Sequence, residues 1–200
     1  MSNRDIDILE KTRVYDGYFR IDRYRLRHGL HEGGMSDEIV REVFERGHAV
    51  GVLPFDPRRD EVVMIEQFRI GAYAAGADAW LKEIVAGIIE DGESAEQVAR
   101  REIHEEAGLT ARALWPMTRY LVSPGGASEL VQLYLAWVDS TNAEGIHGLD
   151  HEHEDIRVFA LPFSEACGLL EDGLIDNAMT IISLQWLMGH HQDVRAAWRD

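Results

Sequence analysis

Hydrophobic and polar residues alternate through much of the first 47 residues, which is the pattern of strands that bury one face. Three stretches show this alternation, at residues 13–15, 18–26 and 36–44. Between the second and the third, a glycine-containing segment at 28–34 predicts a long turn. Because three strands with one apolar face are barely stable alone, we expect this antiparallel sheet to pack on the rest of the chain or on a second subunit.

The remainder of the chain mixes strand-like and helix-like segments. Residues 49–54 and 61–67 flank a turn at 56–60 that contains proline, so they are expected to form a hairpin. We expect further strands at 80–86, 113–122, 130–138 and 156–161, and C-terminal helices at 162–172 and 176–190. Together with a helix in the middle of the chain, this order predicts an α/β (α+β) fold with a mixed sheet between helices.

The central helix is predicted at residues 95–107. Ser94 followed three residues later by Gln97 is typical of a capping box, and Gly108 stands where a left-handed residue commonly ends a helix. At about 100° per residue, one face of the helix is apolar and consists of Ala95, Ala99, Ile103 and Ala107. The segment is therefore an amphipathic helix with defined ends.

Glutamates crowd the border of that apolar face. Glu102 and Glu106 lie one turn apart, and Glu105 points further toward solvent. Like charges at this spacing destabilise a helix by about 0.2–0.5 kcal/mol per pair, so a cation is expected between them. Carboxylate oxygens suit a hard ion such as Mg²⁺. Separately, Arg101 can pair with Glu93 and so hold the preceding loop to the helix. A solvated acidic face is the alternative interpretation of such a cluster.

Composition limits the classes of protein that fit. The 200 residues are 46% hydrophobic, enough for one core, and we divide the chain into an appendage at 1–47 and a main domain at 48–200. The single cysteine, Cys167, excludes an intrachain disulfide. No apolar run approaches the roughly 20 residues of a membrane span. The polar N-terminal segment lacks the apolar core of a signal peptide, so the cytoplasm is the expected location.

The net charge narrows the choice of partner. The chain carries 36 acidic residues against 20 lysines and arginines, a formal charge of −16. That balance argues against a nucleic-acid backbone or an anionic membrane as the partner. A phosphate-bearing small molecule would need metal ions or local arginines to bind here.

A loop at residues 145–155 is rich in aspartate, glutamate and histidine. Such loops are usually only solvent-exposed, but a carboxylate on a mobile loop can also act as a general base toward an attacking water. His151 and His153 are zinc ligand types, yet no cysteine or third histidine accompanies them at a suitable spacing. We therefore favour hard-metal chemistry.

Residues 87–109 resemble the Nudix box, whose pattern is G-x5-E-x7-R-E-U-x-E-E-x-G-U with U a bulky aliphatic residue. The resemblance implies an αβα sandwich and metal-dependent hydrolysis of a nucleoside diphosphate linked to another group. It also implies that two or three Mg²⁺ ions, or Mn²⁺, bind Glu102, Glu106, Glu105 and the carbonyl of Ala86. All the fixed charged and glycine positions are matched, by Gly87, Glu93, Arg101, Glu102, Glu105, Glu106 and Gly108.

The whole chain from about Tyr15 is similar to the ADP-ribose pyrophosphatase subgroup of that family. The similarity is carried by residues 41–48, 65–69, 123–126 and 148–157. It implies cleavage of ADP-ribose to AMP and ribose 5-phosphate. Carried over residue by residue, Glu152 becomes the general base and Glu154 a further metal contact.

The same resemblance implies a substrate site and a homodimer. Arg41 and Arg69 would grip the diphosphate with guanidinium forks, although each can equally be a surface ion pair. Tyr18 would lie against adenine, and the N-terminal strands would exchange between subunits and help build the partner's adenine pocket. The turn that would approach the terminal ribose or its phosphate contains Ser123, Gly125 and Gly126.

Two alternatives remain at this point. A hydrolase of another nucleoside diphosphate sugar, such as GDP-mannose, would share the same box and appendage. A non-catalytic ADP-ribose sensor belongs to another class, but such proteins tend to have a damaged box and this one is complete. A substrate panel scored by turnover separates these possibilities.

Overall fold

The computed structural model of the chain describes residues 5–149, 151 and 153–198. The chain divides into two compact units, which we describe one at a time. The first unit is Met1–His48 with Tyr120–Leu130, and the second unit is Ala49–Arg119 with Val131–Asp200. Within the described residues, no helix is both long and apolar enough to span a membrane.

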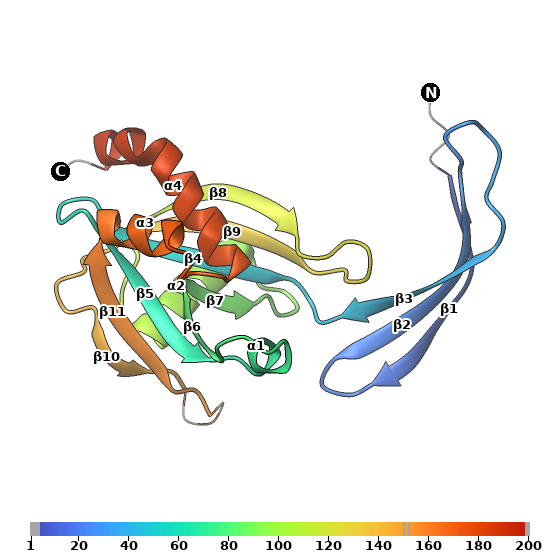
Figure 1. The fold of residues 1–200 in the computed structure, drawn as a ribbon, viewed down its shortest axis with the longest axis horizontal. Helices are drawn as coiled ribbons and strands as arrows, with labels where there is room; N and C mark the ends of the chain where they lie inside the picture. The colour runs from blue at the N-terminus through green and yellow to red at the C-terminus, as the bar shows by residue number, and fades with distance from the viewer. Residues whose placement is uncertain (1–4, 150, 152, 199–200) are drawn as a thin grey trace. The chain divides into compact units, whose positions relative to one another are not determined.

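The first unit contains a three-stranded antiparallel sheet in the order β1-β2-β3, as the alternation predicted (Figure 1). The first strand begins at Ile6, well before the predicted start, because it pairs along the whole second strand as far as His28. Two register shifts, after Ile8 and after Arg13, interrupt the pairing and disturb the alternation that would mark this strand. The strands are β1 (Ile6–Asp16), β2 (Arg20–His28) and β3 (Ile39–Glu45).

A buried carboxylate holds the first two strands together. Asp22 is 1% exposed and accepts from Nε of Arg13 at 2.9 Å, while Nζ of Lys11 lies 3.0 Å from its other oxygen. The hydrogen bonds from Arg13 and Lys11 lower the pKa of Asp22 to about 2. The inward-facing charge is therefore paired, and the register of β1 against β2 is fixed by it.

The second unit contains an eight-stranded mixed sheet in the order β10-β11-β5-β4-β9-β8, with β6 paired to β5 and β7 paired to β4. The β4–β9 pair is parallel, and every other pair with a defined register is antiparallel. The predicted mixed sheet is thus confirmed. Its strands are β4 (Ala49–Asp56), β5 (Glu61–Phe68), β6 (Trp80–Glu83), β7 (Val85–Ile88), β8 (Ala113–Leu121), β9 (Leu130–Trp137), β10 (Glu144–His147) and β11 (Ile156–Pro162).

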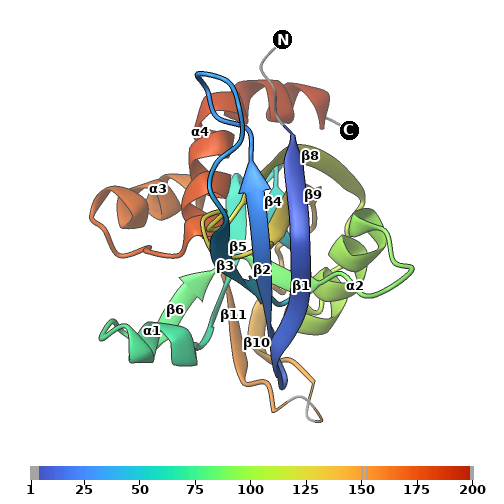
Figure 2. The same ribbon diagram turned by 90° about the vertical axis from the view of Figure 1, so that its right-hand side faces the viewer.

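Helices cover both faces of this sheet, as a sandwich requires. Figure 2 shows α2 and α3 on opposite sides of the strands. Every residue of β4 is buried, because a strand covered on both faces has no polar side. Fully buried side chains such as Val50, Ile65, Val98 and Ile103 join β4 and β5 to the helix α2 in one core. The helices are α1 (Ile70–Ala74), α2 (Ala95–Ala107), α3 (Phe163–Glu171) and α4 (Ala178–Ala197).

The prediction of one strand at 80–86 is wrong, because the segment changes partner at Ile84. The hairpin strands β4 and β5 pair with each other only next to the turn, at Phe55↔Val62 and Asp56↔Glu61. Beyond that point, β6 pairs with β5 and β7 pairs with β4. The inserted segment thus brings residues 83–87 to the middle of the sheet.

Other boundaries also differ from the prediction. The last helix runs to Ala197 rather than to about residue 190, and Trp198 behind it stacks on Trp137 with ring centroids 5.8 Å apart. The elements α1 and β10 were not predicted. They have five and four residues, too few for a hydrophobic period to appear in the sequence.

Candidate active site

The helix α2 carries the predicted carboxylates and begins and ends where the sequence placed its ends. Oγ of Ser94 accepts from the backbone N–H of Gln97, and the Gln97 side chain accepts from the N–H of Ser94 at 2.9 Å. Gly108 has φ 64°, and its N–H donates to the carbonyl of His104 at 3.0 Å. Both caps are confirmed. They fix the rotation at which Glu102 and Glu106 leave the helix.

Glu106 is a buried carboxylate, and Glu102 is largely buried. Glu106 is 3% exposed, and its Oε2 accepts from the backbone N–H of Ala86 at 2.9 Å. The side chain of Glu102 is 12% exposed. Burial raises the pKa of Glu106 to about 8 and that of Glu102 to about 7. The charge of Glu154 adds to both shifts, the charge of Glu105 adds to that of Glu102, and the charge of Glu102 adds to that of Glu106. The two carboxylates are thus short of positive charge.

The strand β7 positions both carboxylates. Ala86 donates to Glu106, and the next residue, Gly87, lies directly against Glu102. A Cβ built on Gly87 would stand 1.8 Å from Oε1 of Glu102, so only a hydrogen atom fits there. The glycine that opens the motif therefore allows the helix and the strand to approach each other.

Arg101 pairs with Glu93, as the sequence suggested. Nε and Nη2 of Arg101 each lie 3.3 Å from an oxygen of Glu93. The same guanidinium also makes two contacts that were not predicted. Its Nη1 donates to Glu102 at 2.8 Å and to Glu105 at 3.0 Å. Part of the positive charge expected among these carboxylates is thus supplied by an arginine of the same helix.

The donor set suits a hard divalent cation. Glu102 and Glu106 offer buried carboxylate oxygens of raised pKa next to the backbone of β7. Among the residues that the structure describes, no three acidic, histidine or cysteine side chains converge to hold a metal ion. Glu105 is tied to Arg101, and Glu154 accepts from the N–H of Leu149 at 3.0 Å. Glu102 and Glu106 are therefore candidate ligands, and further ligands would have to move toward them.

Arg69 lies within electrostatic range of Glu106. Its Nε donates to Glu83 at 2.7 Å, and its charge lowers the pKa of Glu106 against the effect of burial. Glu83 did not stand out in the sequence. The signal that could have found it is a glutamate directly before the apolar run from Ile84 to Ala86.

The other predicted substrate residues belong to the first unit. Tyr18 is 87% exposed and makes an edge contact with Phe19. Nη1 of Arg41 donates to the carbonyl of Val40 at 2.8 Å. The turn from Ser123 is closed by the N–H of Gly126, which donates to the Ser123 carbonyl at 3.0 Å; Gly125 lies between them. The predicted base, Glu152, lies outside the described residues.

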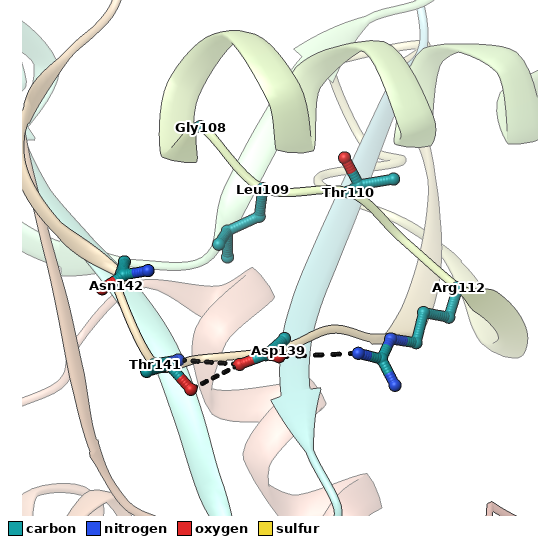
Figure 3. A pocket seen from close by; sticks show the side chains of 7 residues that line it. All are labelled: Gly108, Leu109, Thr110, Arg112, Asp139, Thr141 and Asn142. Atoms are coloured by element: carbon teal, nitrogen blue, oxygen red, sulfur yellow. Dashed lines mark hydrogen bonds and ion pairs between the residues drawn. The ribbon is translucent and has the colours of Figure 1, made fainter.

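A pocket of about 520 Å³ in the second unit does not contain the buried carboxylates (Figure 3). It lies beyond the C-terminal end of α2, and Gly108 is the one predicted residue among those that line it. The charged groups there are Arg112 and Asp139, which pair with each other at 3.5 Å. Thr141 donates to Asp139 at 2.6 Å. The site at Glu102 and Glu106 is therefore separate from this hollow.

Known proteins resemble the chain over nearly its full length. It is 52% identical to ADP-ribose pyrophosphatase of Escherichia coli (strain K12), covering 97% of this chain and 93% of the relative. It is 34% identical to GDP-mannose pyrophosphatase of Pectobacterium atrosepticum, covering 90% and 92%. A solved structure described as an ADP compounds hydrolase matches with a TM-score of 0.70 at 22% identity, covering 95% and 98%, and shows a shared fold.

A family model supports the same assignment. The model described as NUDIX domain matches residues 45–179, which include the capped helix, the buried carboxylates and the glycine that faces them. The chain therefore belongs to the NUDIX family.

Proposed function

We propose that the protein hydrolyses the diphosphate of ADP-ribose to AMP and ribose 5-phosphate in a reaction that depends on divalent cations. The observation that carries this proposal is a pair of carboxylates set against the backbone of β7, the buried Glu106 and the largely buried Glu102. The 52% identity to an ADP-ribose pyrophosphatase favours that substrate within the family.

Glu102 and Glu106 are the proposed ligands of two or three Mg²⁺ ions, with Mn²⁺ as the alternative. Bound there, such ions neutralise the diphosphate and lower the pKa of a coordinated water. Glu105, Glu154 and the carbonyl of Ala86 are the proposed further ligands. Burial makes an ionised carboxylate without a positive partner costly in free energy. The binding of cations would offset that cost.

The chain supplies the remaining parts of the reaction. Arg101 ties the loop at Glu93 to the helix, and its bonds to Glu102 and Glu105 would be given up if these carboxylates held cations. Glu152 is the proposed base that takes a proton from the attacking water. Arg69 and Arg41 are proposed to bind the diphosphate through their guanidinium groups.

Residues of the first unit are proposed to bind the two ends of the substrate. Tyr18 offers an exposed ring for stacking on adenine. Ser123, Gly125 and Gly126 offer backbone N–H groups without bulky side chains to the terminal ribose or its phosphate. These assignments rest on the resemblance to the family and on the exposure of the residues.

We further propose that residues 1–47 act as a dimerisation and substrate-binding appendage to the catalytic domain at 48–200. All eleven residues of β1 are exposed, and among them Ile6 and Tyr15 are 67% and 60% exposed. A second copy of the chain, with exchanged N-terminal strands, would cover such apolar surface. Sedimentation at several protein concentrations tests the homodimer.

The function is tested with purified protein, ADP-ribose and Mg²⁺, with the products separated by chromatography. We expect AMP and ribose 5-phosphate in equal amounts, and none when Mg²⁺ is replaced by a chelator. GDP-mannose is assayed in parallel, because a relative at 34% identity bears that name. Turnover of GDP-mannose with ADP-ribose untouched would replace the proposed substrate, and cleavage of neither would overturn the proposal.

A further inference from the structure

Residues 83–87 connect the groups of the candidate site to one short piece of backbone. At one end, Ala86 donates to Glu106 and Gly87 faces Glu102. At the other end, Glu83 accepts from Arg69. Between them, the N–H of Ile84 donates to Oγ1 of Thr180 in α4 at 3.1 Å. The backbone between β6 and β7 therefore carries Glu83, which binds Arg69, at one end. At the other end it carries Ala86 and Gly87, which contact Glu106 and Glu102.

Glu83 accepts a hydrogen bond from one nitrogen of the Arg69 guanidinium, Nε. Nε of Arg69 lies 2.7 Å from Oε2 of Glu83, and the Glu83 side chain is 5% exposed, whereas that of Arg69 is 41% exposed. Since Nε is the nitrogen nearest the chain, this bond fixes the plane of the guanidinium and keeps Nη1 and Nη2 as the outer donors of the fork. The backbone of Arg69 is also fixed, because its N–H donates to Ala79 at 2.7 Å.

A second donor fixes Glu83 itself. Nδ2 of Asn177 donates to Oε1 of Glu83, the oxygen that Arg69 does not use. Asn177 is in turn the N-cap of α4, where its Oδ1 accepts from the N–H of Thr180 at 3.2 Å. Both oxygens of the carboxylate thus have defined partners from two elements. Glu83 has little freedom to turn, so the guanidinium attached to it has little freedom either.

We propose that Glu83 is a positioning residue, which with Asn177 holds the guanidinium of Arg69 in the orientation that binds a diphosphate. The inference deepens the proposed function and rests on it, because Arg69 is one of the proposed diphosphate ligands. Glu83 itself does not touch the substrate. It acts by fixing a fork that would otherwise have to be ordered each time the ligand binds.

The test compares Glu83→Gln with a matched control, Glu61→Gln. Glu61 is the first residue of β5. Like Glu83, it accepts from the Nε of an arginine, Arg59, at 2.8 Å, and from a neutral donor, Ser140. We expect E83Q to raise KM for ADP-ribose about tenfold with kcat within threefold, and E61Q to change neither by more than twofold. Equal changes in the two variants would show a general effect of losing an ion pair and would overturn the proposal.

A double-mutant cycle with Arg69→Ala shows whether Glu83 acts through Arg69. Binding of inorganic pyrophosphate in the presence of Mg²⁺ is measured by calorimetry for the parent, R69A, E83Q and the double variant. We expect E83Q to weaken binding about tenfold in the parent and less than twofold when Arg69 is absent. Equal weakening in both backgrounds would assign Glu83 a structural role and overturn the proposal.

The binding readout also separates this inference from the proposed function. If the parent cleaves ADP-ribose but E83Q binds pyrophosphate as the parent does, the positioning role is wrong and the function stands. If the parent does not cleave ADP-ribose but the cycle shows the expected coupling, the positioning role stands and the substrate is wrong. No effect of R69A on pyrophosphate binding would overturn the positioning role.

Discussion

At the scale of single residues, the candidate site depends on burying negative charge. Glu106 is 3% exposed, and its Oε2 accepts a hydrogen bond from a neutral donor, the backbone N–H of Ala86. A buried charge without a full partner is costly, and the raised pKa of Glu106 expresses that cost. Such an arrangement persists in a stable fold when something positive binds there during function.

The substitution Glu106→Gln removes the charge with little change in shape. We expect kcat for ADP-ribose to fall at least about 100-fold while KM stays within about threefold, because the lost interaction stabilises charge that develops during the reaction. The variant should not unfold more easily, since a buried carboxyl group whose ionisation is costly has been replaced by a neutral amide of similar shape. The control is Glu96→Gln, on the exposed face of the same helix, where the glutamate pairs with Arg100 at 3.2 Å. Turnover within about threefold of the parent would contradict the role of Glu106.

Gly87→Ala probes the approach of β7 to α2. The added Cβ would stand 1.8 Å from Oε1 of Glu102, and the carboxylate, as the end of a flexible side chain, must move aside. We therefore expect turnover to fall at least about tenfold with little loss of thermal stability. Gly189→Ala serves as the control, because its Cβ would meet no atom within 4 Å. If both variants keep parental turnover, the close approach has no functional importance.

At the scale of elements, α2 is a helix whose ends are determined by local chemistry. Ser94 and Gln97 form a reciprocal cap at the start, and Gly108 ends the helix in the left-handed region. These contacts lie within a few residues along the chain and need no tertiary context. The helix can therefore form with the same ends whatever packs on it, which keeps the two glutamates on its sheet-facing side.

Ser94→Ala tests this view of the helix. Loss of an N-cap side chain typically costs about 1 kcal/mol, so the free energy of unfolding should fall by about that amount in urea titrations. Turnover well below the melting temperature should stay within twofold, because Ser94 lies two turns from Glu102. A stability equal to that of the parent would show that packing alone maintains the helix end.

The same distinction explains what the sequence could predict. The extent of α2, its caps and the pairing of Arg101 with Glu93 follow from spacing along the helix and the loop directly before it. The break at Ile84 does not, because it arises from the way β4 and β5 separate and admit another segment. The proposed role of Glu83 depends on Asn177, which is far away in the sequence. Contacts of this kind become visible only when the chain is folded.

At the scale of the whole molecule, charge connects stability to metal binding. The chain carries a formal charge of −16, and the carboxyl groups of Glu102 and Glu106 have pKa values of about 7 and 8 in the folded state. The ordinary value for glutamate is 4.5. Between these limits the folded protein binds protons that the unfolded chain releases, so the contribution of Glu102 and Glu106 to stability is lost as pH rises.

We therefore expect the metal-free protein to lose stability between about pH 5 and pH 8. Chemical unfolding in a chelating buffer at several pH values measures this slope. Saturating Mg²⁺ should stabilise the protein increasingly as pH rises, because cations bind the ionised carboxylates. The double variant E102Q/E106Q should flatten the slope and abolish the stabilisation by Mg²⁺. A slope in the parent that equals the slope in this variant would contradict the buried-charge account.

The most direct test of the central claim is diffraction from crystals that contain Mg²⁺ and a non-hydrolysable analogue of ADP-ribose with a methylene-bridged diphosphate. The account predicts cations about 2.1 Å from carboxylate oxygens of Glu102 and Glu106, bridged to the diphosphate, with Arg101 withdrawn from Glu102. Density that leaves both carboxylates without a cation, and Arg101 still bound to Glu102 and Glu105, would contradict it.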